Sequence, residues 1–183
     1  MKNISLPLFM LMVVSGLAQE PAPQIARQGQ VSFFSYTTVE NIEAINNHVL
    51  SILDPSDHKI AVSMLMRAFV FKKALMQEHF NESYVESDSY PKATFEGTIL
   101  DFDPYLEGVQ TKMIEGQLTV HGITKETNIK AHIENLKGNY SIHGDFQVAI
   151  KDFEIRVPPV VEKNIAKTIA ITFQFEYTPY KTQ

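Results

Sequence analysis

The sequence predicts a mainly β fold, a single antiparallel β-barrel with one or two short helices packed on it. Three observations lead to this prediction. The chain has 183 residues, which is the length of one domain. Apolar and polar residues alternate with a period of two, most clearly in the second half, so each stretch has one apolar and one polar face. Turn-forming residues separate these stretches at a spacing that fits a meander or a barrel.

Four alternating stretches are the clearest strands: residues 112–120, 125–134, 143–152 and 165–177. The turn signals that separate them are His121-Gly122, Lys137-Gly138-Asn139 and Pro158-Pro159. We expect the double proline to end one strand and to begin a long connection to the last one.

Residues 59–71 (KIAVSMLMRAFVF) form a different kind of strand, since both alternating faces are largely apolar. A strand of this kind is covered on both sides. One side can face the barrel interior, and the other side then needs a lid.

Two segments have helical spacing. Residues 72–81 (KKALMQEHFN) carry two i,i+4 pairs, one of them Met76 with Phe80, and we expect this helix to supply the lid. Residues 39–49 have apolar residues at spacings of three and four, which offers a second helix.

The N-terminal residues 1–18 are typical of a signal peptide. Lys2 supplies the positive charge, residues 4–14 are almost wholly apolar, and Gly16-Leu17-Ala18 offers small residues for cleavage after Ala18. An uncleaved membrane anchor is the alternative, but a span needs about 20 apolar residues and this run is shorter. We therefore expect an exported protein, periplasmic or secreted, with no stable membrane insertion after cleavage.

Beyond the leader, residues 19–29 (QEPAPQIARQG) are expected to be a linker and residues 30–180 the barrel domain. The net charge is −5, and −6 without the leader, which carries one lysine and no acidic residue. No block of basic residues occurs, so nucleic acid is not expected as a partner. Because the chain has no cysteine, an exported form must be stable through its core alone.

No arrangement of residues predicts catalysis, a cofactor or a metal. Six histidines occur, but none belongs to a His-Glu-x-x-His or other close ligand cluster. His132 and His143 lie on polar faces across an expected hairpin, where they could approach each other. His121 is expected to bond backbone groups in its turn, and His79 to interact with the helix end. There is no thiol nucleophile, no Gly-x-Ser-x-Gly elbow and no glycine-rich phosphate loop.

Charged residues gather around the expected helix. Glu78, Glu82, Glu86 and Asp88 are expected to form a solvated rim rather than an acid–base pair. Arg67 is the one charge inside the apolar segment. It either reaches solvent at the rim or meets an anionic head group, for which arginine is well shaped.

Two motifs resemble those of the YceI-like family. Residues 79–95 (HFNESYVESDSYPKATF) combine His-Phe, an acidic spacer and a Tyr-Pro-Lys-Ala-Thr-Phe strand start. Residues 115–125 (EGQLTVHGITK) resemble the family's Gly-x-Leu-Thr-x-His-Gly-Val-Thr-Lys element. The resemblance covers roughly residues 30–178. It implies a lipocalin-like antiparallel β-barrel with a helix packed against it, usually exported, and some members bind polyisoprenoid or other long-chain lipids.

Two stretches depart from the family pattern. Residues 31–38 (VSFFSYTT) lack the usual N-terminal strand motif, and residues 150–155 (IKDFEI) lack the arginine and glycine of the family's Arg-x-Asp-Phe-Gly element. The ligand chemistry of the family therefore need not carry over.

We expect the barrel to hold an apolar, lipid-like molecule, with isoprenoids among the candidates, rather than to catalyse a reaction. A barrel of about eight strands can be filled by side chains or leave room for one ligand. The alternatives are an interaction module with a filled core and, less favoured, a small-molecule enzyme at the barrel mouth; a homodimer stays open. The residues expected to contact the ligand are Phe69, Phe71, Phe95, Leu118, Phe173 and Arg67.

Overall fold

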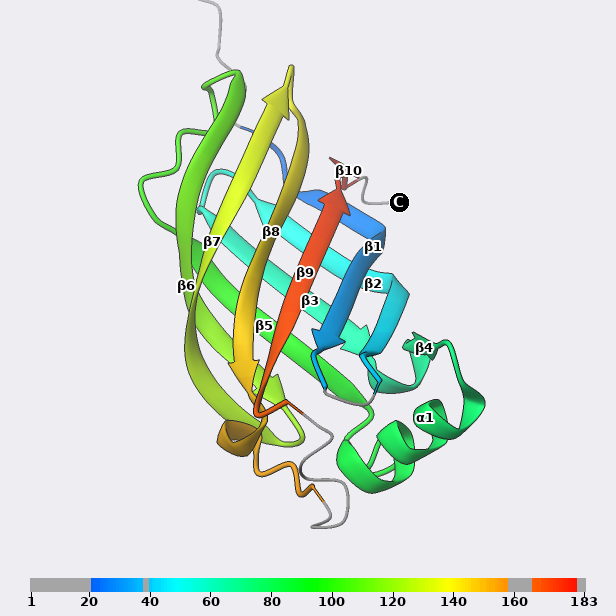
Figure 1. Ribbon diagram of the computed structural model, residues 1–183. Helices are drawn as coiled ribbons and strands as arrows, with labels where there is room; N and C mark the ends of the chain where they lie inside the picture. The colour runs from blue at the N-terminus through cyan, green and yellow to red at the C-terminus, as the bar shows by residue number, and fades with distance from the viewer. Residues whose placement is uncertain (1–20, 38–39, 158–165, 181–183) are drawn as a thin grey trace, which may run out of the picture.

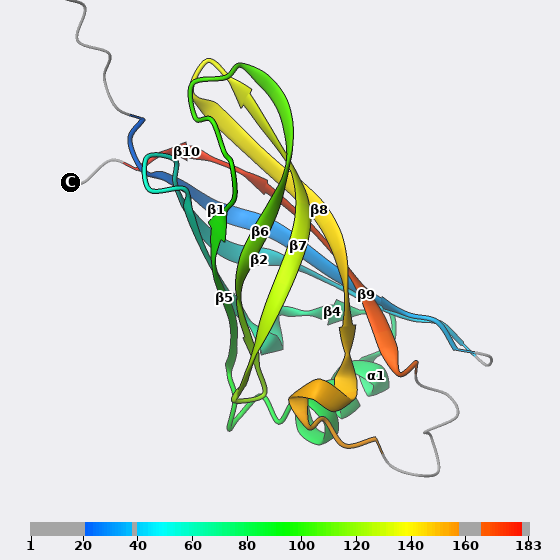
Figure 2. The ribbon, with the colours of Figure 1, turned by 90° about the vertical axis from the view of Figure 1, so that its left-hand side faces the viewer.

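The computed structural model describes residues 21–37, 40–157 and 166–180. Eight antiparallel strands close into a barrel, shown from two directions in Figures 1 and 2. Neighbours around it follow the order β1-β9-β8-β7-β6-β5-β3-β2, and β2 pairs with β1 to close the ring. The strands are β1 (Gln24–Ser35), β2 (Ile42–Asp54), β3 (Lys59–Leu65), β5 (Lys92–Ile99), β6 (Gly108–Val120), β7 (Ile123–Leu136), β8 (Asn139–Ala149) and β9 (Thr168–Glu176), with the two-residue strands β4 (Val70–Phe71) and β10 (Thr178–Pro179) at its edges.

The predicted fold class is confirmed, and the period-two alternation accounts for it. In β7, Ile129, Ala131 and Ile133 are buried, whereas Lys130 between them is exposed. The four strands predicted in the second half correspond to β6, β7, β8 and β9. In the described part of the chain, no helix has the length and apolarity needed to cross a membrane.

Tight turns join β6 to β7 and β7 to β8, as predicted. His121 and Gly122 have φ values of 52° and 74°, and Lys137 and Gly138 have φ values of 55° and 84°. Positive φ at both central residues is the geometry of a two-residue hairpin, whose twist matches that of the strands it joins. The predicted Pro158-Pro159 break lies outside the described residues, as does the expected signal peptide.

The predicted linker over residues 19–29 is partly wrong, because β1 begins at Gln24. Gln24 and Ile25 pair with Leu53 and Ile52 of β2, and Ile25 is buried. This strand start has too few alternating residues to stand out beside the two prolines that precede it.

The predicted helix over residues 39–49 is also wrong, since the segment from Ile42 onward is β2. A β-bulge explains the misleading spacing. Asn46 and Val49 both point inward, and the pairing with β1 shifts between them. The Asn46 Oδ1 atom accepts a hydrogen bond of 2.9 Å from the His48 backbone N–H. One extra residue changes the interval between buried positions from two to three, which imitates a helix.

Residues 59–71 do not form one strand, which corrects the prediction of a strand covered on both sides. A 3₁₀ turn at Met66–Ala68 separates β3 from β4. The turn moves the inward positions from even to odd numbers, so Val62 in β3 and Phe71 in β4 both lie in the core. Both apolar faces of the sequence therefore serve one interior.

The helix predicted over residues 72–81 is confirmed as α1 (Ala74–His79), which continues into a π-helical turn at Phe80–Tyr84. Its predicted position is wrong. It lies across the lower end of the barrel in Figures 1 and 2 instead of covering the outer face of a strand. Because the π-helical turn follows His79 directly, this residue does not end the helical segment.

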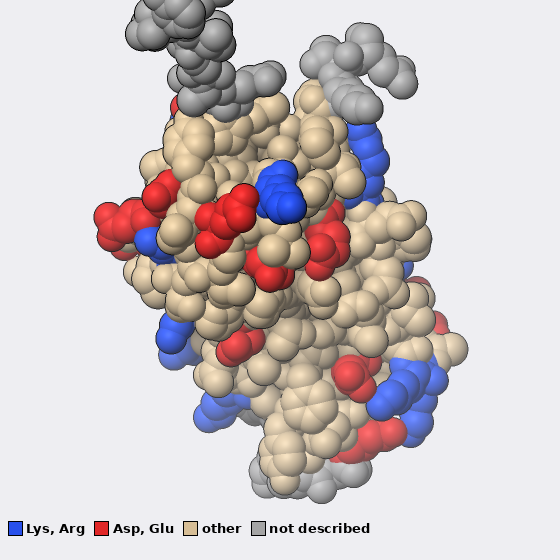
Figure 3. Space-filling view, turned by 90° about the horizontal axis from the view of Figure 1, so that it is seen from above, with Lys and Arg blue, Asp and Glu red and all other residues tan. Residues whose placement is uncertain are grey.

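The opposite, upper end of the barrel is closed by packed side chains. Leu53, Ile99, Ile133 and Ile142 are each at most 1% exposed. We call this the closed end and the end beside α1 the open end. On the surface seen from above in Figure 3, acidic and basic side chains are mixed, so this face has no large patch of one charge sign.

The loop between β5 and β6 is anchored to the closed end. The Pro104 carbonyl accepts hydrogen bonds from the Asn135 side chain at 2.9 Å and from the Tyr140 hydroxyl at 2.8 Å. Phe102 from the same loop is buried against Tyr140. These bonds satisfy polar groups that packing removes from water.

Candidate ligand-binding cavity

The open end of the barrel contains a cavity of about 220 Å³. Its walls come from the inward positions of the barrel strands at this end, from α1 and the π-helical turn, and from residues 150–157 after β8. Nearly all of the lining side chains are apolar. Ser35, His79 and Tyr84 are the lining residues that carry a polar group on the side chain. A cavity of this composition excludes water in favour of apolar molecules.

An aromatic cluster joins the helical segment to the strands at the cavity wall. The Phe80 ring stacks on Phe33 with a centroid distance of 5.5 Å, and it also contacts Phe69 and Phe71 at 5.8 and 5.0 Å. Phe80 follows directly after α1, so its ring ties the helical segment to strands β1 and β4. Aromatic pairs in these tilted and stacked geometries add to the stabilisation from burial.

The 3₁₀ turn before β4 brings two of these rings to the cavity. The Pro91 carbonyl accepts a hydrogen bond of 2.9 Å from the Met66 backbone N–H, and the Asn46 side chain donates to the Leu65 carbonyl at 3.0 Å. These bonds fix the turn, after which Phe69 and Phe71 point inward. The shift of the inward positions from even to odd residue numbers thus places these aromatic rings at the cavity wall.

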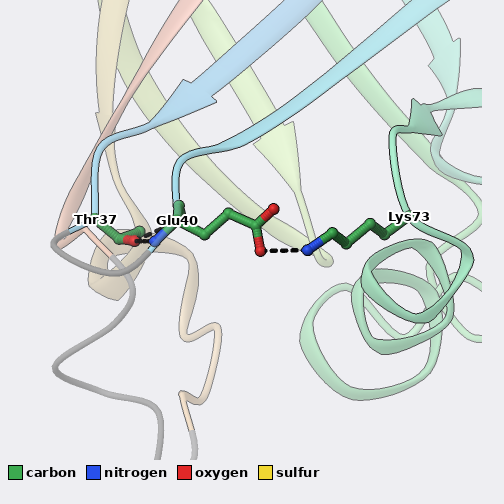
Figure 4. A network of polar contacts seen from close by, with 3 residues as sticks. All are labelled: Thr37, Glu40 and Lys73. Carbon is green, nitrogen blue, oxygen red and sulfur yellow. Dashed lines mark hydrogen bonds and ion pairs between the residues drawn. The ribbon is translucent and has the colours of Figure 1, made fainter.

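Two charged contacts join α1 to the strands on the outside. The Lys73 Nζ atom lies 2.6 Å from the Glu40 carboxylate (Figure 4). The Lys72 Nζ atom lies 3.0 Å from the Glu43 carboxylate. The Glu40 backbone N–H donates to the Thr37 hydroxyl at 3.0 Å, which fixes the hairpin that carries the carboxylate. These pairs are solvent-exposed, so each is weakly stabilising.

Of the residues predicted to contact a ligand, Phe69, Phe71 and Leu118 line this cavity. Phe95 and Phe173 instead line a smaller hollow of about 50 Å³ deeper in the barrel, which Leu118 also borders. The structure therefore brings five of the six residues to the barrel interior, at two levels.

Arg67 is the exception, and its position agrees with the first of its two expected roles, in which it reaches solvent. Its guanidinium lies outside both hollows, where it pairs with Asp88. The cause is the 3₁₀ turn, which puts Arg67 on the solvent side, within reach of the linker that follows α1.

Several lining residues were missing from the prediction. Phe33 of β1, Phe146 of β8 and Ile171 of β9 border the main cavity. Each belongs to the apolar face of an alternating stretch, but alternation marks only the inward face and not the level along the barrel axis. The signal that could have found them is the register of neighbouring strands, since Phe146 pairs with Ile171 and Ile171 with Phe33.

Among the described residues, no carboxylate, lysine or arginine lines the cavity. The Ser35 hydroxyl accepts a hydrogen bond of 3.2 Å from the Ala166 backbone N–H. Burial raises the pKa of Tyr84, so its phenol stays neutral at the wall. His79 is exposed at the edge. The cavity can thus hold a neutral apolar molecule without stranding a buried charge.

His121 ties the β6–β7 turn to both segments that border the open end, so its role is wider than the local one predicted. Its Nδ1 atom lies 3.1 Å from the Phe153 carbonyl and its Nε2 atom 3.1 Å from the Glu86 carboxylate. Tyr90 packs edge-on against the ring at 4.4 Å. Because both oxygen partners are acceptors, the imidazole satisfies both as a donor only when both nitrogens carry a proton.

The other predicted features concern the surface. His132 and His143 do approach each other, with stacked rings 5.1 Å apart. Across residues 21–37, 40–157 and 166–180, no group of three or more His, Asp or Glu side chains could hold a metal ion. The acidic residues after α1 are exposed, as predicted, and two of them pair with Arg67 and His121.

A family model for the YceI-like domain matches residues 26–177, which is most of the chain. The chain belongs to the YceI-like family. This result agrees with the two sequence motifs and with a barrel that begins near residue 24 rather than 30. No curated protein sequence matches the chain.

Solved structures share the fold of this YceI-like chain. A polyisoprenoid binding domain from Saccharophagus degradans, implicated in plant cell wall breakdown, superimposes with a TM-score of 0.74 at 11% identity, over 87% of this chain and 99% of that chain. Burkholderia cenocepacia BcnA gives 0.68 at 14% identity, over 82% and 96%. A Campylobacter jejuni YceI protein gives 0.59 at 15% identity, over 80% and 90%. At these identities the likeness concerns the fold alone.

Proposed function

We propose that this protein is an exported binding protein that holds one apolar, lipid-like molecule in the open-end cavity. The observation that carries the proposal is the apolar cavity of about 220 Å³ inside a closed barrel. Burying a methylene group from water contributes about 0.8 kcal/mol, so a chain of several carbons binds measurably in such a space. The Saccharophagus degradans neighbour, a polyisoprenoid binding domain, supports the same class of ligand.

The cavity favours a binding protein over an interaction module with a filled core. A filled barrel has few voids larger than a water molecule, whereas this one leaves room for a small organic molecule. It also favours binding over catalysis. General acid–base chemistry needs two positioned titratable groups, and the described wall offers an exposed histidine and a neutral tyrosine from separate turns of one helical segment.

Export is supported by the leader pattern of residues 1–18. We infer a periplasmic or secreted carrier or sensor that shields its ligand from water. N-terminal sequencing of the protein recovered from the cell envelope or medium tests this part: the mature chain should begin after Ala18, and an intact Met1 would contradict it.

The binding proposal is tested by native mass spectrometry on protein purified without detergent and mixed with straight-chain and isoprenoid alcohols of increasing length. We expect a one-to-one complex with at least one of them. Val120→Phe, at the cavity wall on β6, should weaken binding about tenfold or more, because the ring occupies the space of two or more methylene groups. Val109→Phe is the matched control, since Val109 lies on the same strand but is 62% exposed. Failure of every alcohol to bind would overturn the proposal.

A further inference from the structure

Three phenylalanine rings fill the middle of the barrel, one level deeper than the cavity. Phe95 belongs to β5, and Phe173 and Phe175 belong to β9. All three are at most 9% exposed. The Phe173 and Phe175 rings stack with centroids 5.5 Å apart.

Each ring lies directly against an inward-facing glycine of a neighbouring strand. A Cβ atom at Gly116 of β6 would lie 2.7 Å from the Phe95 ring, and one at Gly144 of β8 would lie 2.8 Å from the Phe173 ring. Such distances are too short for a real Cβ atom, and the same Cβ atoms would also meet the backbone carbonyl oxygens of Glu96 and Lys130. No larger residue therefore fits without moving both the ring and the neighbouring strand. The glycines therefore let the rings lie against the wall and occupy this level of the barrel.

The levels follow from the strand positions. On β6, Leu118 comes before Gly116 when the strand is traced inward from the open end, and on β9 Ile171 comes before Phe173. Leu118 and Ile171 border both the main cavity and the hollow of about 50 Å³, whereas Phe95, Phe173 and Phe175 border only the latter. Beyond the rings, the closed end is packed. The rings are thus the floor of the hollow, and the main cavity lies above it, separated from it by side chains that border both spaces, such as Leu118 and Ile171.

The volume above this floor limits what can be enclosed. A cavity of about 150 Å³ lined by leucine, isoleucine and phenylalanine holds one benzene molecule. By the same proportion, the main cavity of about 220 Å³ and the hollow of about 50 Å³ together hold roughly ten carbon atoms.

We propose that Phe95, Phe173 and Phe175 limit how deep a ligand can enter the barrel, and that they restrict its enclosed part to roughly ten carbon atoms. The inference rests on the proposed binding function and specifies its ligand class as a short apolar chain, of terpenoid or medium-chain lipid size. A long polyisoprenoid would leave most of its chain outside the barrel.

The test is the dependence of affinity on chain length, measured by competition with a fluorescent apolar dye that is small enough for the cavity, such as 1-naphthylamine. The competitors are straight-chain alcohols in series, with geraniol, farnesol and geranylgeraniol as isoprenoid members. Affinity should rise about fourfold for each added methylene group until the cavity is full, and then level off near ten carbons.

Variants of the floor should move this plateau. Phe95→Ala enlarges the hollow at the bottom of this space, so affinity should continue to rise for several more carbons. Phe95→Leu should do the same to a smaller extent and retains more of the core. Ile171→Phe adds bulk above the floor and should move the plateau to shorter chains. Phe102→Ala is the control, because Phe102 is a phenylalanine as buried as Phe95 that borders neither hollow. Thermal unfolding of each variant identifies those that fold.

The outcomes separate the two proposals. Affinity in the wild type that keeps rising through farnesol to geranylgeraniol overturns the depth limit and leaves the binding function intact. A plateau that does not move in Phe95→Leu or in Ile171→Phe overturns the role of the rings. Failure of alcohols of every length to compete overturns the binding function itself.

Discussion

The two ends of this barrel are built from the same eight strands but differ in what crosses them. At the closed end, a loop is fixed by hydrogen bonds to the Pro104 carbonyl, and side chains such as Leu53 are fully buried beneath it. At the open end, the crossing element is α1, in which no residue is buried. Strand alternation therefore decides which face is apolar, while the crossing element decides whether the interior is filled.

The difference also lies in the side chains at each end. Branched aliphatic residues pack together at the closed end, where Ile99 pairs with Ile114 and Ile133 with Ile142, and the rings of Phe102 and Tyr140 pack beside them. Aromatic rings and methionines border the open end, including Phe69, Phe80 and Met64. Rings contact one another at their edges and faces and leave gaps that aliphatic chains would fill. The open end should thus tolerate changes that the closed end does not.

The largest expected effect comes from truncating a leucine at each end. Leu53→Ala should lower the free energy of unfolding by about 4 kcal/mol, since it leaves a new cavity in a packed region. Leu118→Ala should lower it by about 2 kcal/mol, because one side of Leu118 already faces a hollow and loses fewer contacts. Urea denaturation measures both. Equal losses would show that the two ends are packed alike.

The next effect is a pH dependence centred on the closed end. Tyr177 is fully buried there, with its hydroxyl 2.7 Å from the Ser51 hydroxyl, and burial raises its pKa far above the ordinary value of 10.0. The unfolded chain then releases the phenolic proton at a pH where the folded chain retains it. The stabilising contribution is complete below pH 10 and is lost as the pH rises, at up to about 1.4 kcal/mol per pH unit.

Two tyrosine variants test this assignment. Tyr177→Phe should flatten the decline of the free energy of unfolding at alkaline pH, as measured by urea denaturation from neutral to alkaline buffers. Tyr84→Phe, at the open end, should flatten it less, because burial raises the pKa of Tyr84 by a smaller amount. An unchanged alkaline decline in Tyr177→Phe would show that another group causes it.

Much of this architecture could be predicted from the sequence, because alternation and turn residues are local signals. The turns at Gly122 and Gly138 and the strands on either side were found in this way. The errors arose where a bulge or a short turn changes which alternate residues of a strand face inward. The bulge before Val49 imitated a helix, and the turn at Met66–Ala68 made one inward face look like two. A phase change depends on the partner strand, which the sequence of one strand does not contain.

The cavity could be predicted only in part for a related reason. Phe69, Phe71 and Leu118 were identified as interior residues, but their level along the barrel axis follows from the register between strands. For Arg67 the sequence left two positions open, and the 3₁₀ turn that puts it in solvent depends on contacts with other strands. Whether apolar residues leave a hollow depends on how rings such as Phe95 meet glycines on other strands, which is a property of packing and not of composition.

The smallest expected effect concerns the contacts that hold α1 at the open end. A double-mutant cycle with Glu40→Gln and Lys73→Gln should give a coupling free energy of about 0.5 kcal/mol at low salt, falling as salt is added, because both side chains are about half exposed. A cycle of Glu40→Gln with Lys137→Gln, in the β7–β8 turn at the other end, should give none. If the pair also restrains the helical segment, Lys73→Gln should speed amide hydrogen exchange in residues 74–84 and leave exchange in β7 unchanged. A coupling above about 2 kcal/mol would mean that the pair is desolvated, and that the open end is held as firmly as the closed one.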